Sequence, residues 1–159
     1  MNNLMVNEAV STLQRRYAYA LDRREMEVWL ECFATDGSYL CQTKENFDEG
    51  LSIGFMLDDC YARLQDRVKA IEEVWAGTAE EYQSRHMVSP IHIGEPADGM
   101  VEAVSNFVVF YTTNRGHSSI LATGEYRDVI RVSGETAQFK SRKAILDQSV
   151  IPRYLVYPI

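Results

Sequence analysis

The sequence has few cysteines, few prolines and no excess of positive charge, and these shortages exclude several classes of protein. Its 159 residues include only 3 Cys and 4 Pro. An odd number of cysteines without regular spacing does not form a disulfide framework, so we expect reduced thiols and a cytoplasmic location. The formal net charge of −7 argues against nucleic acid as a partner, because neutralising phosphates requires a basic patch.

Long apolar runs are also missing. The first ten residues, MNNLMVNEAV, lack the basic segment and apolar core of a signal peptide, and no run reaches the roughly 20 residues of a membrane span. We therefore expect no membrane partner. The composition, 46% hydrophobic and 25% charged, is that of an ordinary globular chain, and its length predicts one domain over residues 1–159.

The spacing of apolar residues predicts helices in the first half and strands in the second. Helices are expected at about 7–21, 24–34 and 57–75, with a short strand after the turn at Asp36-Gly37 and a loop at 44–54. Four long strands are expected at 85–93, 100–114, 118–132 and 136–146. Short Gly-containing turns favour antiparallel hairpins, and strands this long must curl. The predicted fold class is α+β, with a cone-shaped curved antiparallel sheet wrapped around the N-terminal helices.

Two histidines, His86 and His92, lie close together in the stretch SRHMVSPIHIGEP. A mononuclear iron site needs two histidines and a carboxylate that converge on one ion. A regular strand would separate these two by about 20 Å, at roughly 3.3 Å per residue. A Rieske cluster needs closely spaced Cys–His pairs, and no cysteine here lies within three positions of a histidine. We therefore expect no metal site, and we expect His117 at the surface.

An acid–base site remains open. The wide end of the cone predicts a pocket that Tyr17, Asp22, His86 and Tyr126 could line. A histidine bonded to a carboxylate can transfer protons there. Structural roles compete for the same residues. Asp22 with Glu25 resembles a helix capping box, His86 can bond to backbone at a strand start, and Tyr17 lies on the apolar stripe of the first helix.

The stretch SVIPRYLVYPI, residues 149–159, is unusually apolar. Such a segment must be buried, either on its own core or on a neighbouring subunit. Aromatic and aliphatic residues together with an arginine are typical of interface centres. We therefore expect it to dock at or near a subunit contact, with docking on its own barrel as the alternative.

Five segments in this order resemble the small (β) subunit of Rieske-type aromatic-ring-hydroxylating dioxygenases. They are YALDRREMEVWLECFATDGSY, LDDCYARLQDRVKAI, SRHMVSPIHI, GEYRDVIRV and FKSRKAILD. The resemblance spans nearly the whole chain and depends on the ordered set of segments, because no single motif is decisive.

The resemblance implies a nuclear-transport-factor-like, cystatin-like barrel and a homotrimer of β subunits within an α3β3 assembly. It implies that the partner α subunit holds the Rieske iron–sulphur cluster and the mononuclear iron, that this chain binds no cofactor, and that its role is structural. The holoenzyme would add O2 to an aromatic ring in aromatic catabolism, using electrons from NADH. The same barrel also hosts enzymes. A stand-alone dehydratase or isomerase of the scytalone dehydratase or ketosteroid isomerase type, using Asp22 and His86, therefore stays an alternative, as does a non-catalytic small-ligand-binding barrel.

Overall fold

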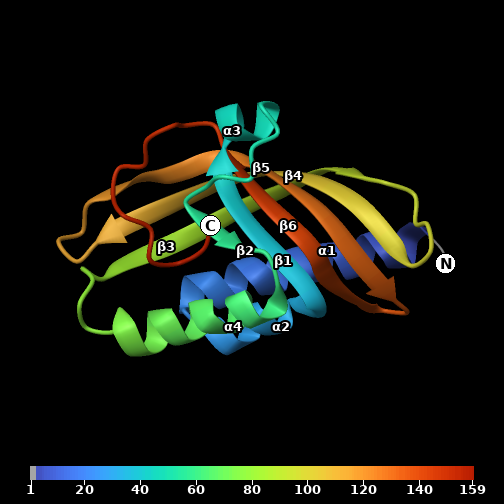
Figure 1. Ribbon diagram of the computed structural model, residues 1–159, viewed down its shortest axis with the longest axis horizontal. Helices are drawn as coiled ribbons and strands as arrows, with labels where there is room; N and C mark the ends of the chain where they lie inside the picture. The colour runs from blue at the N-terminus through green and yellow to red at the C-terminus, as the bar shows by residue number, and fades with distance from the viewer. Residues whose placement is uncertain (1–2) are drawn as a thin grey trace.

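Helices pack against one curved sheet in the computed structural model, which describes residues 3–159 (Figure 1). The first two residues of the predicted domain lie outside this range. The elements are α1 (Asn3–Arg23), α2 (Met26–Glu31), β1 (Phe33–Thr43), α3 (Lys44–Asp48), β2 (Met56–Asp58), α4 (Tyr61–Lys69), η1 (Ala70–Val74), β3 (Tyr82–Ile93), β4 (Met100–Thr113), β5 (Ser118–Ser133) and β6 (Thr136–Leu146). Figure 1 shows α1, α2 and α4 grouped along one side of the sheet, apart from α3.

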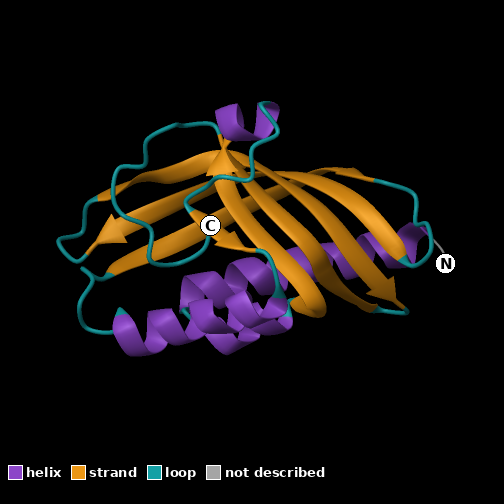
Figure 2. Cartoon of the chain, in the orientation of Figure 1, coloured by secondary structure: helices purple, strands orange, loops and turns teal. Residues whose placement is uncertain are grey.

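The sheet has the strand order β2-β1-β6-β5-β4-β3. The predicted antiparallel hairpins are confirmed from β3 to β6. The sheet as a whole is mixed, because β1 pairs with β6 in parallel. Register shifts interrupt each of the four long pairings, and such bulges bend strands and increase their twist. Figure 2 shows the resulting curvature, which confirms the expected cone-shaped α+β fold.

The predicted helix at 24–34 is too long, and the first strand is longer than expected. The α2 helix ends at Glu31, and β1 begins at Phe33 opposite Phe139 of β6. The sheet supplies the backbone partners here, since the Phe139 N–H donates to the Cys32 carbonyl at 2.8 Å. The predicted turn at Asp36-Gly37 is a bulge within β1. A Cβ at Gly37 would lie 2.7 Å from the carbonyl oxygen of Ala34, so only glycine fits.

Two further boundaries differ from the prediction. The predicted loop at 44–54 contains α3, whose first turn is capped by Thr43 Oγ1 accepting from the Asn46 N–H at 3.2 Å. The predicted helix at 57–75 begins only at Tyr61, because Leu57 belongs to β2 and pairs with Leu40. The last turn of this helix widens into the π-helix η1.

The apolar stripe of α1 is confirmed as the face that packs against the sheet. Its buried residues include Val10, Leu13, Tyr17, Ala20 and Leu21. Aromatic rings from the helices and the strands pack together in the core beside this stripe. The fully buried rings are Tyr17, Trp29, Phe33, Tyr39, Phe107, Tyr126 and Phe139. The interior of the cone is therefore filled by side chains. Within residues 3–159, no helix combines the length and the apolar character that crossing a bilayer requires.

A buried ion pair lies inside this aromatic cluster. Arg142 of β6 and Asp128 of β5 are cross-strand partners, and both side chains have 0% exposure. Arg142 Nε and one Nη donate to the two carboxylate oxygens at 2.9 and 2.8 Å. Gln14 of α1 completes the network by donating to Asp128 at 2.9 Å and accepting from Arg142. The guanidinium carbon lies 3.9–4.1 Å from the ring centroids of Tyr17, Tyr126 and Phe139.

We predict that Asp128→Asn lowers the free energy of unfolding by about 3–5 kcal/mol, because it leaves Arg142 charged and buried without its counterion. Urea denaturation of the parent and the variant measures the difference. The control is Asp36→Asn, which removes an exposed carboxylate paired with Arg131 and Lys140 and should change stability little. Equal losses in the two variants would contradict this account.

Candidate functional site

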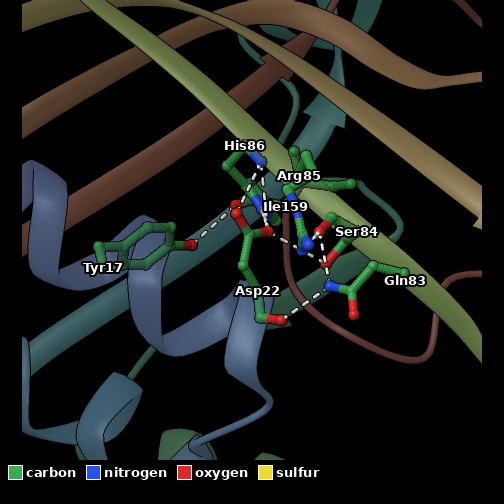
Figure 3. Close-up of polar contacts among 7 residues, drawn as sticks. All are labelled: Tyr17, Asp22, Gln83, Ser84, Arg85, His86 and Ile159. Carbon is green, nitrogen blue, oxygen red and sulfur yellow. Dashed lines mark hydrogen bonds and ion pairs between the residues drawn. The ribbon is translucent and has the colours of Figure 1, made fainter.

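Asp22 and His86 form a hydrogen-bonded pair between the last turn of α1 and the edge strand β3 (Figure 3). His86 Nδ1 lies 2.7 Å from Asp22 Oδ1. The same carboxylate accepts from the His86 backbone N–H at 3.0 Å and from the Ser84 hydroxyl at 3.2 Å. Asp22 therefore ties the end of α1 to β3. It does not cap the next helix, since the N-cap of α2 is Glu25 and makes no side-chain cap bond.

The hydrogen bond between His86 Nδ1 and the Asp22 carboxylate fixes the tautomer of a neutral His86. Because the carboxylate only accepts, Nδ1 carries the proton and Nε2 presents its lone pair. The His86 side chain is 2% exposed, and Nε2 has no hydrogen-bond partner among residues 3–159. Burial acts to raise the pKa of Asp22, but the hydrogen bonds from His86 and Ser84 and the electrostatic interaction with the imidazole outweigh it, so the pKa lies below its usual value. The carboxylate is ionised at neutral pH.

The other two candidate residues have different surroundings. The Tyr17 hydroxyl donates to the backbone carbonyl of Ile159 at 2.7 Å, toward which Figure 3 shows it directed. Tyr126 stacks on Phe107 with 4.4 Å between ring centroids, and its hydroxyl has no partner in the described chain. Both tyrosines are fully buried in the aromatic cluster, where their rings lie 6.1 Å apart. The structure thus brings Asp22 and His86 into contact and places both tyrosines in the core.

Residues 149–159, called here the closing segment, dock on the barrel of their own chain. Val156 and Ile159 are 4% and 1% exposed. The Arg24 guanidinium donates to the Tyr157 hydroxyl at 3.0 Å and lies 4.6 Å from its ring centroid. Arg24 has a φ of 61°, and its contacts with the closing segment and with Tyr82 hold this strained backbone. The segment thus docks on the barrel of its own chain, and the expected subunit contact stays a prediction. Val150 and Tyr154, 77% and 54% exposed, remain at the surface.

A groove between α1 and β3 runs past the pair. It has a volume of about 290 Å³, and Gln14, His86, Val88 and Pro90 contribute to its walls. It lies at the side of the barrel, between α1 and the edge strand. A small molecule in this groove would meet mainly the polar residues of α1, because the His86 side chain is almost fully buried and Tyr17 and Tyr126 lie in the core.

The donor groups do not fit a metal ion. No group of three or more His, Cys, Asp or Glu side chains with suitable placement occurs in residues 3–159. His86 is committed to Asp22, whereas His92 follows a bulge in β3 and is exposed. Burial raises the pKa of the Cys32 thiol to about 11 and that of Cys41 to about 12, so neither is a ready thiolate. His117 is exposed, as predicted.

Sequence patterns did not identify several residues of the interior. Arg142 and Asp128 carried a usable signal, because charges of opposite sign occupy inward positions of two predicted neighbouring strands. Tyr39 and Ile159 carried none, since the bond between the Tyr39 hydroxyl and the Ile159 carbonyl, 3.1 Å long, joins positions 120 residues apart.

The fold and the site together define a curved α+β barrel with a packed interior and no set of metal donors in the described residues. The model of the ring hydroxylating beta subunit family matches residues 16–153. The chain belongs to this family, and it is a β subunit of an aromatic-ring-hydroxylating dioxygenase. The resemblance seen in the sequence is thereby confirmed.

Three known proteins illustrate the relationship. The anthranilate 1,2-dioxygenase small subunit of Burkholderia cepacia is 34% identical over 92% of this chain and 90% of its own. The terephthalate 1,2-dioxygenase terminal oxygenase component subunit beta 2 of Comamonas sp. is 28% identical over 98% of this chain and 100% of its own. A solved β subunit assigned to an aromatic-ring-hydroxylating dioxygenase of Novosphingobium aromaticivorans has a TM-score of 0.84 and 30% identity, covering 98% of this chain and 97% of that one.

We predict that Asp22→Asn destabilises the fold by about 2 kcal/mol at pH 7, because three donors lose a charged acceptor. The folded pKa of Asp22 is lowered, so its contribution is fully present above the unfolded value of about 3.9 and is lost as the pH falls through the folded value. Urea denaturation at several pH values between 7 and 3 measures this. Ser84→Ala, which removes one donor only, serves as the control. A parent–variant difference that stays constant down to pH 3 would argue against this role.

Proposed function

We propose that this chain is a structural subunit whose partner α subunit contains the Rieske cluster and the catalytic mononuclear iron. The observation that carries the proposal is the packed interior of the barrel. Seven buried aromatic rings and the Arg142–Asp128 pair occupy the volume in which a barrel enzyme of this fold would hold its substrate. A subunit with this interior contributes shape and stability to an oxygenase, and the chemistry belongs to its partner.

We propose an α3β3 assembly in which the β subunits trimerise through the sheet. The outer face supports this, because exposed apolar residues there are register neighbours. Phe110 of β4 pairs with Ile120 of β5, and Met87 of β3 pairs with Val108. Phe110, Ile120 and Met87 are 40%, 50% and 63% exposed. Apolar side chains that adjoin on a surface mark contact sites. The net charge of −7 would orient this chain toward basic patches on the α subunit.

We propose that the complex acts on a ring that bears a carboxylate, in the cytoplasm, where NADH supplies electrons. The relatives support the substrate class, since the two described above are named for anthranilate and terephthalate. The three cysteines are free thiols in the structure, which suits a reducing compartment.

A tagged pull-down from the native host tests the subunit role. We expect a larger partner to co-purify and to give the visible absorbance bands of an iron–sulphur cluster. The purified complex, supplied with its reductase and NADH, should consume O2 with anthranilate or terephthalate and much less with naphthalene. A colourless chain that elutes alone, or only with copies of itself, would refute the subunit role.

The role of His86 is tested in the assembled complex. We expect His86→Asn to retain oxygenation, because an Asn amide can still donate to Asp22 and the residue takes no part in the chemistry. An acid–base role would instead cost roughly 10²–10⁴-fold in turnover. The measurement is O2 uptake by complexes of confirmed subunit composition. A loss of that size with intact assembly would contradict a purely structural role for His86.

A further inference from the structure

The chain exposes apolar side chains at every second position where it runs from α3 into β2 (Figure 1). These residues are 36–62% exposed, and none of them belongs to the buried core cluster. Met56, which lies between two of them and faces the sheet, is only 3% exposed. We call the exposed set the apolar strip, and it consists of Leu51, Ile53, Phe55 and Leu57.

Hydrogen bonds to two neighbouring elements hold the backbone of the apolar strip. The Asn46 carbonyl of α3 accepts from the Leu51 N–H at 2.8 Å, and the Asn46 side chain donates to the Ile53 carbonyl at 3.0 Å. The Phe55 N–H donates to the Cys41 carbonyl of β1 at 2.7 Å. The strip is therefore ordered before any partner arrives, which lowers the entropy cost of binding through it.

Carboxylates flank the apolar strip in the chain. Residues 44–59 contain five acidic residues and one lysine. Asp48 and Asp59 pair with basic neighbours, whereas the exposed Glu45 and Glu49 have no ion-pair partner within residues 3–159. Two copies of the chain that met through this strip in a twofold contact would bring like charges together. The charges therefore favour a different surface, in which Lys or Arg side chains surround an apolar centre.

The apolar strip lies at the opposite end of the sheet from the residues proposed for trimer contacts. The strand β2 is one edge of the order β2-β1-β6-β5-β4-β3, and Met87, Phe110 and Ile120 lie on the last three strands. A β subunit that meets its copies through those residues still exposes the strip. An acidic and apolar surface at this edge is therefore available to a different subunit.

We propose that the apolar strip is a docking surface for the partner α subunit, which would present an apolar patch surrounded by basic side chains. This inference rests on the proposed subunit role. Ile53, the most exposed member of the strip, and Phe55, its aromatic member, would be the central contacts and supply affinity through burial. The unpaired carboxylates of Glu45 and Glu49 would orient the encounter.

The test uses the tagged chain co-produced with its α subunit, which is identified by its mass and its iron–sulphur absorbance. Ile53→Ser/Phe55→Ser removes the centre of the strip. Val74→Ser, at a position of η1 with 64% exposure, is the control for loss of an exposed apolar side chain. We expect the double variant to retain at least tenfold less α subunit than the parent, with its association with its own copies unchanged in native mass spectrometry. The control should retain as much α subunit as the parent.

A second variant tests the flanking charges and leaves the apolar strip intact. Glu45→Gln/Glu49→Gln should lower the amount of retained α subunit several-fold at about 20 mM salt and have no effect at about 500 mM, because salt screens exposed charges. This variant also decides the question if the serine double variant does not fold. Equal retention by parent and glutamine variant at low salt would then overturn the inference.

The remaining outcomes separate this inference from the subunit role. A serine double variant with the urea midpoint of the parent that retains α subunit within twofold of the parent overturns the inference and leaves the subunit role intact. A double variant that loses its own copies together with the α subunit also overturns it, because the strip would then belong to the contact between β subunits. A parent chain that captures no α subunit refutes the subunit role, and the inference with it.

Discussion

The buried pair of Arg142 and Asp128 is the constraint on which the rest of the barrel depends. A guanidinium with 0% exposure is tolerated only when its charge is matched, and removing either partner leaves an unpaired charge in the core. Nε and Nη2 of Arg142 are hydrogen-bonded, whereas Nη1 has no hydrogen-bond partner within residues 3–159. The match needs three elements at once, because Asp128 lies on β5, Arg142 on β6 and Gln14 on α1. It therefore fixes the register of two strands and the position of the helix across them. It also fills the middle of the cone with charge and aromatic rings.

The Asp22–His86 pair follows from the same packing problem. The helix α1 must lie across the concave face to cover Arg142, and its last turn then meets the edge strand β3. Asp22 satisfies the backbone N–H of His86 on the inner face of β3, and the imidazole adds a second bond from the same residue. A carboxylate and a histidine in contact are consistent with acid–base chemistry, but here each also completes a structural junction. Residue types that suit catalysis therefore do not by themselves establish it in this fold.

The sequence predicts the strand-rich half well, because local patterns determine it. Alternating apolar residues and Gly-containing turns placed β6 at its observed bounds and β3 to β5 within a few residues. It predicts only the second part of β1, since Phe33 and Ala34 continue a helical spacing and only the distant partner Phe139 makes them a strand. The prediction of Leu57 as the start of a helix was also wrong. Its spacing to Tyr61 matches a helix by coincidence, whereas in the structure it pairs with Leu40 of β1. The contact of Asp22 with His86 could be proposed from residue types. The occupation of the core by Ile159 could not, because nothing local marks it.

The closing segment buries some of its apolar residues in the core and exposes others at the surface. Its apolar character suggested an interface, yet Val156 and Ile159 complete the core of the same chain. Other residues of the same segment, Val150 and Tyr154, stay exposed at the surface. The exposed apolar residues Met87, Phe110 and Ile120 lie on the outer face of the sheet, where they do not contribute to the core. Under the proposed assembly, folding and association use opposite faces of one sheet, so a substitution that impairs association through Phe110 need not disturb the Arg142 network on the inner face.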